Sequence, residues 1–208
     1  MLTVLVTGHI CVDITPKLLS PADIVPGELR EIGAPRFSLG GCVANTGFDL
    51  IESGTKTVVE AVVGDDYLGE IARQELQRKG ADTSRIKTVR GKSTSYSIVF
   101  SPENTDRTLW HDPGANVAFD PRNVDLTGVD IMHIGYPPIL PGTLEDDGAP
   151  LRDLLKRAKS MGITTSMDMA GVDPKSEGAK VNWNRFFELT LPYLDVFSPS
   201  VEDIFTAR

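Results

Sequence analysis

The chain has 208 residues, of which 40% are hydrophobic and 24% are charged, and its formal net charge is −8. This composition is ordinary for a globular protein with one substantial core, and no apolar run is long enough to span a membrane. The acidic balance lacks the basic surface that general nucleic-acid binding requires, so we expect neither a nucleic-acid partner nor a membrane partner.

The first third of the chain alternates between strand and helix patterns. Residues 3–7 form a continuous apolar run, which predicts a central parallel strand that is covered on both faces. Residues 43–53 have helical spacing, and 57–63 read as a strand. A second helical pattern starts at Leu68 and ends before Gly80.

The same alternation continues in the second half. Strand patterns at 130–135 and 163–169 flank a helical pattern at 150–161, and a helical region around 182–192 precedes a strand from residue 195. Strands that alternate with helices predict an α/β domain with a mostly parallel sheet.

Two segments interrupt this alternation, at 14–38 and 92–112. They contain short strand-like patches, including 94–100 and 107–111, separated by a turn. We expect them to form a small β lid over one edge of the larger domain. The core domain would then comprise residues 1–13, 39–91 and 113–208.

The last eleven residues, SPSVEDIFTAR, predict the start of a helix. Ser200 is the expected N-cap, and Asp203 stands three residues later, as in a capping box. The helical pattern covers about two turns, so we expect these 208 residues to belong to a longer protein whose core domain continues.

The N-terminus and the cysteines favour a cytoplasmic protein. Residues 1–14 lack a basic leader and a cleavage site and resemble a buried strand instead. Cys11 and Cys42 have no spacing typical of a disulfide framework or a metal site.

Several common catalytic motifs are missing. The turn after the first strand, VTGHICVD, lacks the three glycines of a dinucleotide fingerprint, and no Walker P-loop occurs. His9 and His133 lie in apolar strands, where a structural role is the more common one. The sequence therefore disfavours both a Rossmann oxidoreductase and a P-loop kinase.

The segment around FSLGGCVANTG holds the most informative polar residues. Asp13 follows the first strand, where open α/β sheets bind ligands, and its carboxylate could accept hydrogen bonds from two vicinal hydroxyls or form a turn before Pro16. Gly40 and Gly41 would let a ligand approach the backbone, and Asn45 offers a donor and an acceptor, although an ordinary helix entry fits equally well.

Two further motifs accompany this segment. Asp65 and Asp66, in VVGDDYLG, are expected to cap the following helix. In DPGANVAF, Asn116 follows a lid-like strand and could face the same ligand as Asn45.

Together these motifs resemble the ribokinase/PfkB family of sugar and nucleoside kinases, in order and spacing along essentially the whole chain. Each motif is weak alone, but six in register are specific. They are Asp13, PGE (26–28), the glycine pair with Asn45, GDDYLG (64–69), GAN (114–116) and SPSVED (198–203).

The resemblance implies a doubly wound α/β domain with a β lid that often mediates dimerisation. It also implies transfer of the ATP γ-phosphate to a primary hydroxyl of a small sugar or polyol, with Mg²⁺. The residues that would line the acceptor pocket are Asp13, Gly40, Gly41, Asn45 and Asn116.

The nucleotide side of the resemblance is less complete. The family's N-x-x-E motif, which helps to organise Mg²⁺ and phosphates, falls on Ser200 to Asp203, which makes Asp203 the metal candidate. Asp168 ends a strand at the same sheet edge and is a further candidate for contact with nucleotide or substrate. The family's D-T-x-G-A-G-D signature, with its catalytic base, is absent, so we expect the base beyond Arg208 and an inactive chain when these residues stand alone.

Two other functions stay open. A nucleoside kinase would need an aromatic-lined acceptor pocket, and the candidate walls are Phe37, Tyr96, Phe100 and Trp110. A non-catalytic sugar-binding or regulatory protein could use the same fold.

Overall fold

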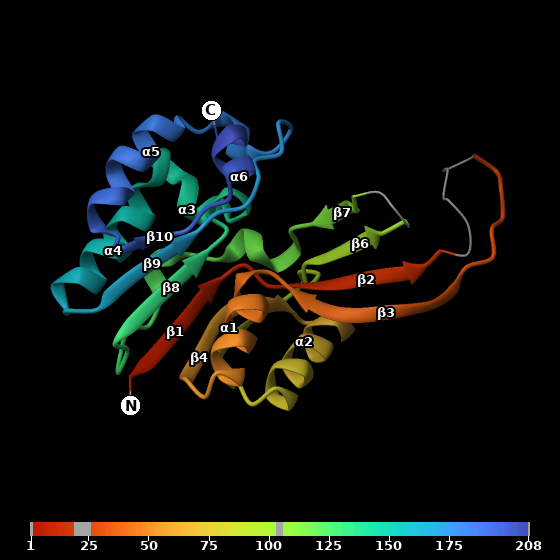
Figure 1. Ribbon diagram of the computed structural model, residues 1–208, viewed down its shortest axis with the longest axis horizontal. Coiled ribbons are helices and arrows are strands. Elements are labelled where there is room, and N and C mark those ends of the chain that lie inside the picture. The colour runs from red at the N-terminus through yellow and green to blue at the C-terminus, as the bar shows by residue number, and fades with distance from the viewer. Residues whose placement is uncertain (1, 19–25, 103–105, 208) are drawn as a thin grey trace.

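The computed structural model describes residues 2–18, 26–102 and 106–207. Its strands form two sheets, a six-stranded sheet flanked by helices and a four-stranded sheet that extends away from it (Figure 1). We call the first the core sheet and the second the lid sheet. The predicted α/β class with a mostly parallel sheet is confirmed.

The core sheet has the strand order β10-β9-β8-β1-β4-β5, and its neighbouring strands pair in parallel. The apolar runs predicted from the sequence form its centre, because a parallel strand covered on both faces is apolar along its whole length. The strands are β1 (Thr3–Gly8), β4 (Lys56–Gly64), β5 (Asp82–Val89), β8 (Ile131–Gly135), β9 (Thr164–Asp168) and β10 (Val196–Phe197).

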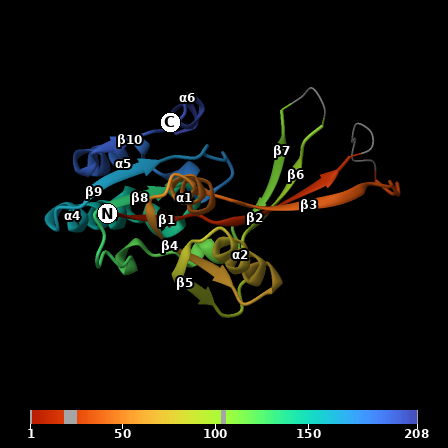
Figure 2. The ribbon, with the colours of Figure 1, turned by 60° about the horizontal axis from the view of Figure 1, so that its bottom comes forward.

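Helices cover both faces of the core sheet. In Figures 1 and 2, α1 and α2 lie on one side and α4 and α5 on the other. None of the helices in the described ranges combines the length and apolarity needed to cross a bilayer. The α-helices are α1 (Cys42–Glu52), α2 (Tyr67–Arg78), α3 (Pro141–Leu144), α4 (Ala149–Ser160), α5 (Trp183–Thr190) and α6 (Val201–Thr206). Short 3₁₀ helices are η1 (Gly114–Ala118), η2 (Pro121–Asn123), η3 (Pro137–Ile139), η4 (Glu145–Gly148), η5 (Glu177–Lys180) and η6 (Leu191–Tyr193).

The order in which the chain adds strands to the core sheet reverses between β1 and β8. From β1 the chain passes through α1 and α2 to β5 at one edge, whereas from β8 it passes through α4 and α5 to β10 at the other. Right-handed crossovers in opposite directions place the helices on opposite faces, which makes the sheet doubly wound. Ligands of such sheets bind beyond the carboxyl ends of the strands at this reversal.

Each helical layer buries its own hydrophobic cluster. On β4, Val58 and Val62 pack in the cluster under α4 and α5, while Val59 and Val63 pack in the cluster under α1 and α2. This division follows from the alternation of side chains along a strand. Both faces of the core sheet are therefore covered by packed side chains.

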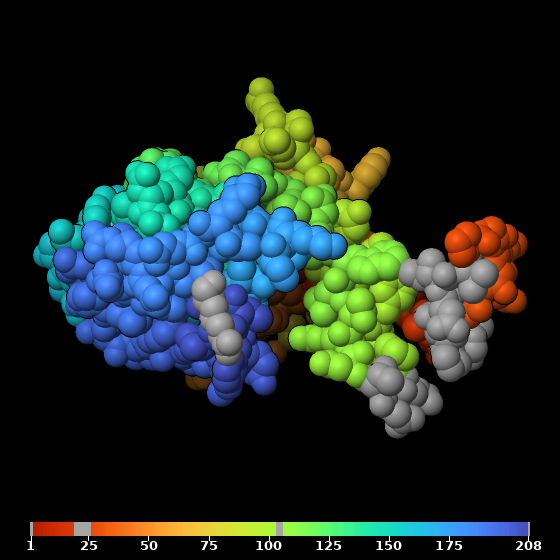
Figure 3. Space-filling view, turned by 90° about the horizontal axis from the view of Figure 1, so that it is seen from above, coloured from red at the N-terminus to blue at the C-terminus, as the bar shows by residue number. Residues whose placement is uncertain are grey.

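The lid sheet has the strand order β3-β2-β6-β7. Strand β2 pairs antiparallel with β3 and parallel with β6, and β6 pairs antiparallel with β7. Figure 3 shows this sheet projecting from the body of the molecule. The strands are β2 (Cys11–Lys17), β3 (Gly33–Gly40), β6 (Tyr96–Phe100) and β7 (Thr108–Asp112).

Strand pairing gives the lid sheet two unlike faces. Asp13 pairs with Ser38 and Ser97, and Ser97 pairs with His111, so these four residues form a polar row on one face. The adjacent row, on the opposite face, consists of Ile14, Phe37, Ile98 and Trp110. We call these the polar face and the apolar face of the lid sheet.

The structure differs from the sequence-based expectations in two places. Strand β5 was not predicted, because Ile86 is its single buried residue and the strand lies at the sheet edge. The lid strands begin at Cys11 and extend to Gly40, beyond the expected limits 14–38. Parts of the expected lid, at 19–25 and 103–105, lie outside the described residues.

Candidate active site

The glycine pair forms a close junction between the lid sheet and α1. Gly41 is the N-cap of α1 with φ 85°, a conformation that favours glycine. A Cβ at Gly41 would collide with the carbonyl oxygen of His9 and stand 2.6 Å from His9 Nδ1. At Gly40, a Cβ would collide with Asp13 Oδ2. Both glycines are therefore required by close packing around Asp13 and His9.

Asp13 lies on the polar face of β2 and is half-buried. Cys11 Sγ donates a weak hydrogen bond to Asp13 Oδ1 at 3.4 Å. The other oxygen, Oδ2, is the one that faces Gly40. This carboxylate thus lies beside the amino end of α1.

Asn45 lies on the first turn of α1, is exposed, and contacts a residue that the sequence analysis missed. Burial raises the pKa of Tyr136, and a hydrogen bond with the Asn45 side chain opposes this rise. Tyr136 directly follows β8 and has a left-handed backbone, with φ 66° and ψ 51°. A non-glycine residue in this region is strained, and such strain is frequent at ligand sites.

Asp168 ends β9 and shares its surroundings with Asp203. Partial burial raises the pKa of Asp168, a backbone hydrogen bond from Met169 at 2.7 Å lowers it, and the charge of Asp203 raises it further. Two carboxylates that repel each other at a strand end form a donor set suited to a hard divalent cation such as Mg²⁺.

Ser200 and Asp203 form the predicted capping box of α6. Ser200 Oγ accepts a hydrogen bond from the Asp203 backbone at 3.1 Å, and Asp203 Oδ2 accepts one from the Ser200 backbone at 2.9 Å. The capping box holds both side chains at the start of α6, where the charge of Asp203 acts on Asp168. It also uses one of the two carboxylate oxygens of Asp203.

Asn116 occupies a different environment from the other acceptor candidates. It is completely buried in η1, and its Nδ2 donates a hydrogen bond to the Ile10 carbonyl at 2.8 Å. Within the described residues its Oδ1 has no hydrogen-bond partner. In this conformation Asn116 supports the segment that carries His9 and Asp13 and presents no exposed amide to a ligand.

The two aspartates before α2 have separate roles. Asp66 is the N-cap, as predicted, and accepts a hydrogen bond from Gly69 at 2.9 Å. It also accepts hydrogen bonds from Thr94, next to β6, at 2.6 and 2.8 Å. Asp65 does not cap the helix but accepts a hydrogen bond from Gly91. The GDDYLG motif thus fastens the start of β6 to the core.

The four aromatic residues considered as nucleoside-pocket walls lie on the face of the lid sheet opposite to Asp13. Phe37 and Trp110 belong to the apolar row, and Phe100 packs edge-on against Trp110. Tyr96 is two residues from Ile98 on the same strand and therefore shares its face. Their position removes the specific argument for a nucleoside kinase.

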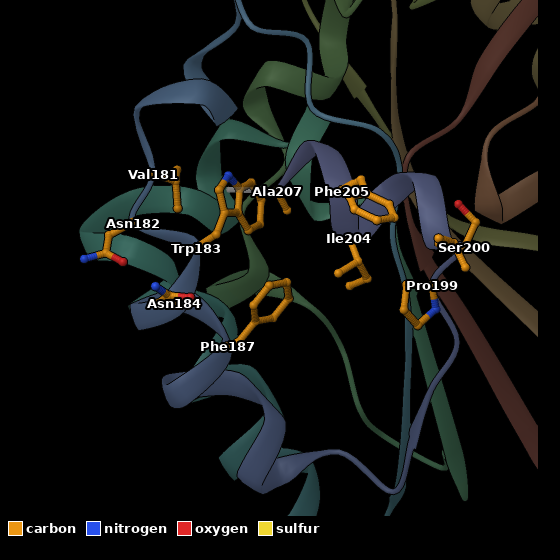
Figure 4. Close-up of a pocket in the computed structure, with 11 residues that line it drawn as sticks. Val181, Asn182, Trp183, Asn184, Phe187, Pro199, Ser200, Ile204, Phe205 and Ala207 are labelled. Carbon is orange, nitrogen blue, oxygen red and sulfur yellow. The ribbon is translucent and has the colours of Figure 1, made fainter.

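An apolar cavity of about 930 Å³ lies between α5 and α6 (Figure 4). Its walls include Trp183, Phe187, Ile204 and Phe205, and Ser200 lies at its end. None of the residues that line it is charged. The cavity therefore offers no charged partner to a phosphate group, and it is separate from the polar row that carries Asp13.

In Figure 3 a hollow separates the C-terminal segment, in blue, from β6 and β7 of the lid sheet, in green. Asp13 lies on the polar face of the lid sheet, and Asp203 belongs to α6 in the C-terminal segment. Tyr136 lies near Asp168 and Asp203, since the charges of both contribute to its raised pKa. Asp168, at the carboxyl end of β9, and Asp203 thus lie near each other, whereas Asn116 is buried in η1.

The chain matches the family model of pfkB family carbohydrate kinases over residues 1–203. It is 27% identical over 173 residues to an ATP-dependent ribose-1-phosphate kinase of Halopiger xanaduensis, and the aligned region covers 81% of this chain and 54% of the relative. It is 24% identical to a deoxyribokinase of Salmonella typhi over 55% of this chain and 38% of that protein. The chain thus spans about half, or less, of the length of these relatives.

Solved structures agree with the fold. A PfkB family carbohydrate kinase from Listeria grayi superposes with a TM-score of 0.75 at 19% identity, covering 98% of this chain and 62% of that chain. A fructokinase with bound ATP from Xylella fastidiosa gives a TM-score of 0.75 at 18% identity, covering 99% and 60%. At such low identity these likenesses establish the shared fold.

Proposed function

Because the chain belongs to the pfkB family of carbohydrate kinases, we propose that its 208 residues bind the sugar acceptor of an ATP-dependent phosphotransfer. The acceptor would be a small sugar or polyol with a primary hydroxyl group. Asp13 and Asn45 would bind its hydroxyls, and the backbone at Gly40 and Gly41 would lie against it.

One observation carries this proposal: the close packing of Gly40 against Asp13, which any side chain would block, holds the Asp13 carboxylate beside the amino end of α1. A carboxylate accepts two hydrogen bonds from vicinal hydroxyls, and an amide both donates and accepts. The N-terminus of α1 adds the positive end of a helix dipole. A polyhydroxylated ligand matches this combination of groups better than an apolar ligand does.

Asp168 and Asp203 would hold the Mg²⁺ that accompanies ATP, and Ser200 would lie beside its phosphates. The mutual repulsion of the two carboxylates supports this assignment, since a cation would relieve it. Bound ATP would supply the phosphoryl group. The residues of this chain would orient the acceptor, and the lid sheet, as a second folding unit, would exclude water from it.

No side chain of the described residues is assigned here as the base that accepts the acceptor's proton. The relatives are longer than this chain, and we expect these 208 residues to bind sugar without transferring phosphate. Phosphoryl transfer by a chain of verified mass would show that this expectation is wrong.

Acceptor binding is tested by calorimetric titration of ribose, deoxyribose, fructose and ribose 1-phosphate. We expect saturable binding of at least one of them and about a 10–100-fold loss in Asp13→Asn, because hydrogen bonds to a charged group contribute about 1.5–3 kcal/mol. The matched control is Asp49→Asn, an exposed aspartate on α1. Equal binding by both variants, or none by the parent chain, would contradict the proposal.

We further propose that the lid sheet mediates a homodimer through its apolar face. Phe37 and Trp110 are about half exposed, with fractional exposures of 51% and 49%. The double variant Phe37→Glu, Trp110→Glu places two negative charges on this face and should be monomeric. Light scattering measures the mass of both the parent and the variant. The control is Leu109→Glu, because Leu109 is similarly exposed but belongs to the other face. A monomeric parent chain would refute the dimer.

A further inference from the structure

Three metal-ligating side chains meet beside the glycine pair: His9, Cys11 and His111. The ligand atoms of this cluster all lie within 4.8 Å of one another. They come from the connection between β1 and β2, from β2, and from β7 of the lid sheet. Cys11 and His111 are both on the polar face, so the cluster is a product of the lid-sheet register and could not be found from sequence spacing.

His9 is the clearest sign of a ligand. Its side chain is 3% exposed, and within the described residues neither ring nitrogen has a hydrogen-bond partner. An unpaired polar group in the interior carries a desolvation penalty of about 1–3 kcal/mol. A cation bound to one of the ring nitrogens would relieve this penalty.

Cys11 and His111 are the other donors of the cluster, and Asp13 lies next to Cys11. Cys11 Sγ and Asp13 Oδ1 are 3.4 Å apart, close to the separation of about 3.5 Å expected for two ligands of a tetrahedral zinc ion. His111 contacts Ser97 through Nδ1 at 3.2 Å, and its other ring nitrogen remains for a metal. His111 is exposed, which gives an ion a route into the site.

The charges around the cluster favour a cation. The carboxylates of Asp112 and Asp13 both act on His111, and no lysine or arginine of the described residues is among the causes of its pKa shift. Two imidazoles and a thiol are borderline-to-soft ligands, which select zinc and similar transition metals over Mg²⁺ or Ca²⁺. The cluster therefore differs in chemistry from the carboxylate pair at Asp168 and Asp203.

We propose that His9, Cys11 and His111 bind a Zn²⁺-class transition-metal ion, and that Asp13, which contacts Cys11 but lies outside the 4.8 Å cluster, turns toward the ion as its fourth ligand. Binding would join β7 of the lid sheet to the connection that follows β1 in the core. If Asp13 also binds the acceptor, which rests on the proposed function, metal and sugar exclude each other. The site would then make acceptor binding sensitive to transition metals.

Cobalt and zinc titrations of the chelator-treated chain test this site without any sugar. We expect one equivalent of Zn²⁺ by calorimetry and, with Co²⁺, a thiolate-to-metal charge-transfer band. Cys11→Ser should remove the band, and His111→Gln should weaken binding at least about tenfold. The matched controls, Cys42→Ser and His133→Gln, replace residues of the same types outside the cluster and should retain both signals.

Circular dichroism of each variant separates loss of the site from loss of the fold. The proposal is overturned if the parent chain binds no stoichiometric metal, or if a folded Cys11→Ser variant gives the parental cobalt spectrum. Calorimetric titration of sugar with and without Zn²⁺ then tests the shared ligand. Competition supports Asp13 as the fourth ligand, and independent binding removes Asp13 from the metal site. Metal binding without sugar binding would contradict the proposed function alone.

Discussion

The core sheet and the lid sheet differ in what covers their strands. Every residue of β1 is buried, and so is β4 after its first residue. In β7 of the lid sheet, four residues are exposed and the last is half-buried. Helices cover both faces of the core sheet, whereas the lid sheet extends from it and carries a polar row on one face and an apolar row on the other (Figures 1 and 3).

The side chains of the core sheet mainly pack against each other, whereas those of the lid sheet are free to contact a ligand or a second subunit. A core strand is stabilised by the hydrophobic area that it buries within the chain itself. The lid strands bury little, so their side chains gain most when a ligand meets the polar face or a second subunit meets the apolar face. Substitutions should therefore affect stability in the core and recognition in the lid.

The largest difference is expected between two identical substitutions, Leu5→Ala in β1 and Leu109→Ala in β7. Leu5 is completely buried, and its truncation should lower the free energy of unfolding by about 3–5 kcal/mol, because it leaves a cavity. Leu109 is 47% exposed, and its truncation should cost less than about 1 kcal/mol. Urea unfolding of both variants measures the two free energies. Equal losses of stability would contradict the proposed difference between the core sheet and the lid sheet.

A second comparison concerns the junction of the two sheets. Gly41 and Gly54 have similar φ values, 85° and 81°, but a Cβ at Gly54 would meet nothing within 4 Å. Gly54→Ala should cost about 1–2 kcal/mol for its backbone conformation alone. Gly41→Ala should cost about 3 kcal/mol, because His9 must also move, and should abolish sugar binding.

Unfolding curves and sugar titrations of these two variants provide the measurement. If Gly41→Ala were no less stable than Gly54→Ala and still bound sugar, the close junction would have no functional role.

The pH dependence of stability should also distinguish the two sheets. Burial lowers the pKa of His133 in β8 to about 4, whereas an unfolded histidine titrates near 6.5. The unfolded chain therefore binds more protons between these values, and stability present above pH 6.5 is lost as the pH falls toward 4. The loss from this residue should be about 2 kcal/mol between pH 7 and 5.

His133→Gln should flatten this pH dependence more than His111→Gln, because His111 lies on the exposed strand of the lid sheet. The comparison uses the midpoint of urea unfolding at pH 7, 6 and 5. A larger effect of His111→Gln would place the titrating group in the lid sheet instead.

The sequence predicted the core sheet well for a physical reason. A strand buried on both faces needs an apolar run, and such runs at β1, β4 and β8 are visible without an alignment. Strand β5 was not predicted from the sequence because an edge strand needs few apolar residues. Its threonine, isoleucine and valine residues, which favour strands, were the available signal.

Candidate site residues could be proposed from the sequence where one segment carries several groups, as with Gly40, Gly41 and Asn45. The site was not predictable where distant segments meet. The contact of Tyr136 with Asn45 depends on β8 lying next to β1, and the cluster of His9 with His111 depends on the lid-sheet register. Asn116 belongs to the GAN motif, but the motif does not show that its side chain is buried, because burial depends on packing against other segments.

The most direct test of the account is a crystal structure of the chain with the sugar that binds most tightly in the titrations. The account predicts electron density for the sugar against the backbone of Gly40 and Gly41, with hydroxyl groups within hydrogen-bond distance of Asp13 and Asn45. Density for the sugar elsewhere, for example in the apolar cavity at Trp183, with Asp13 left without a contact, would contradict it.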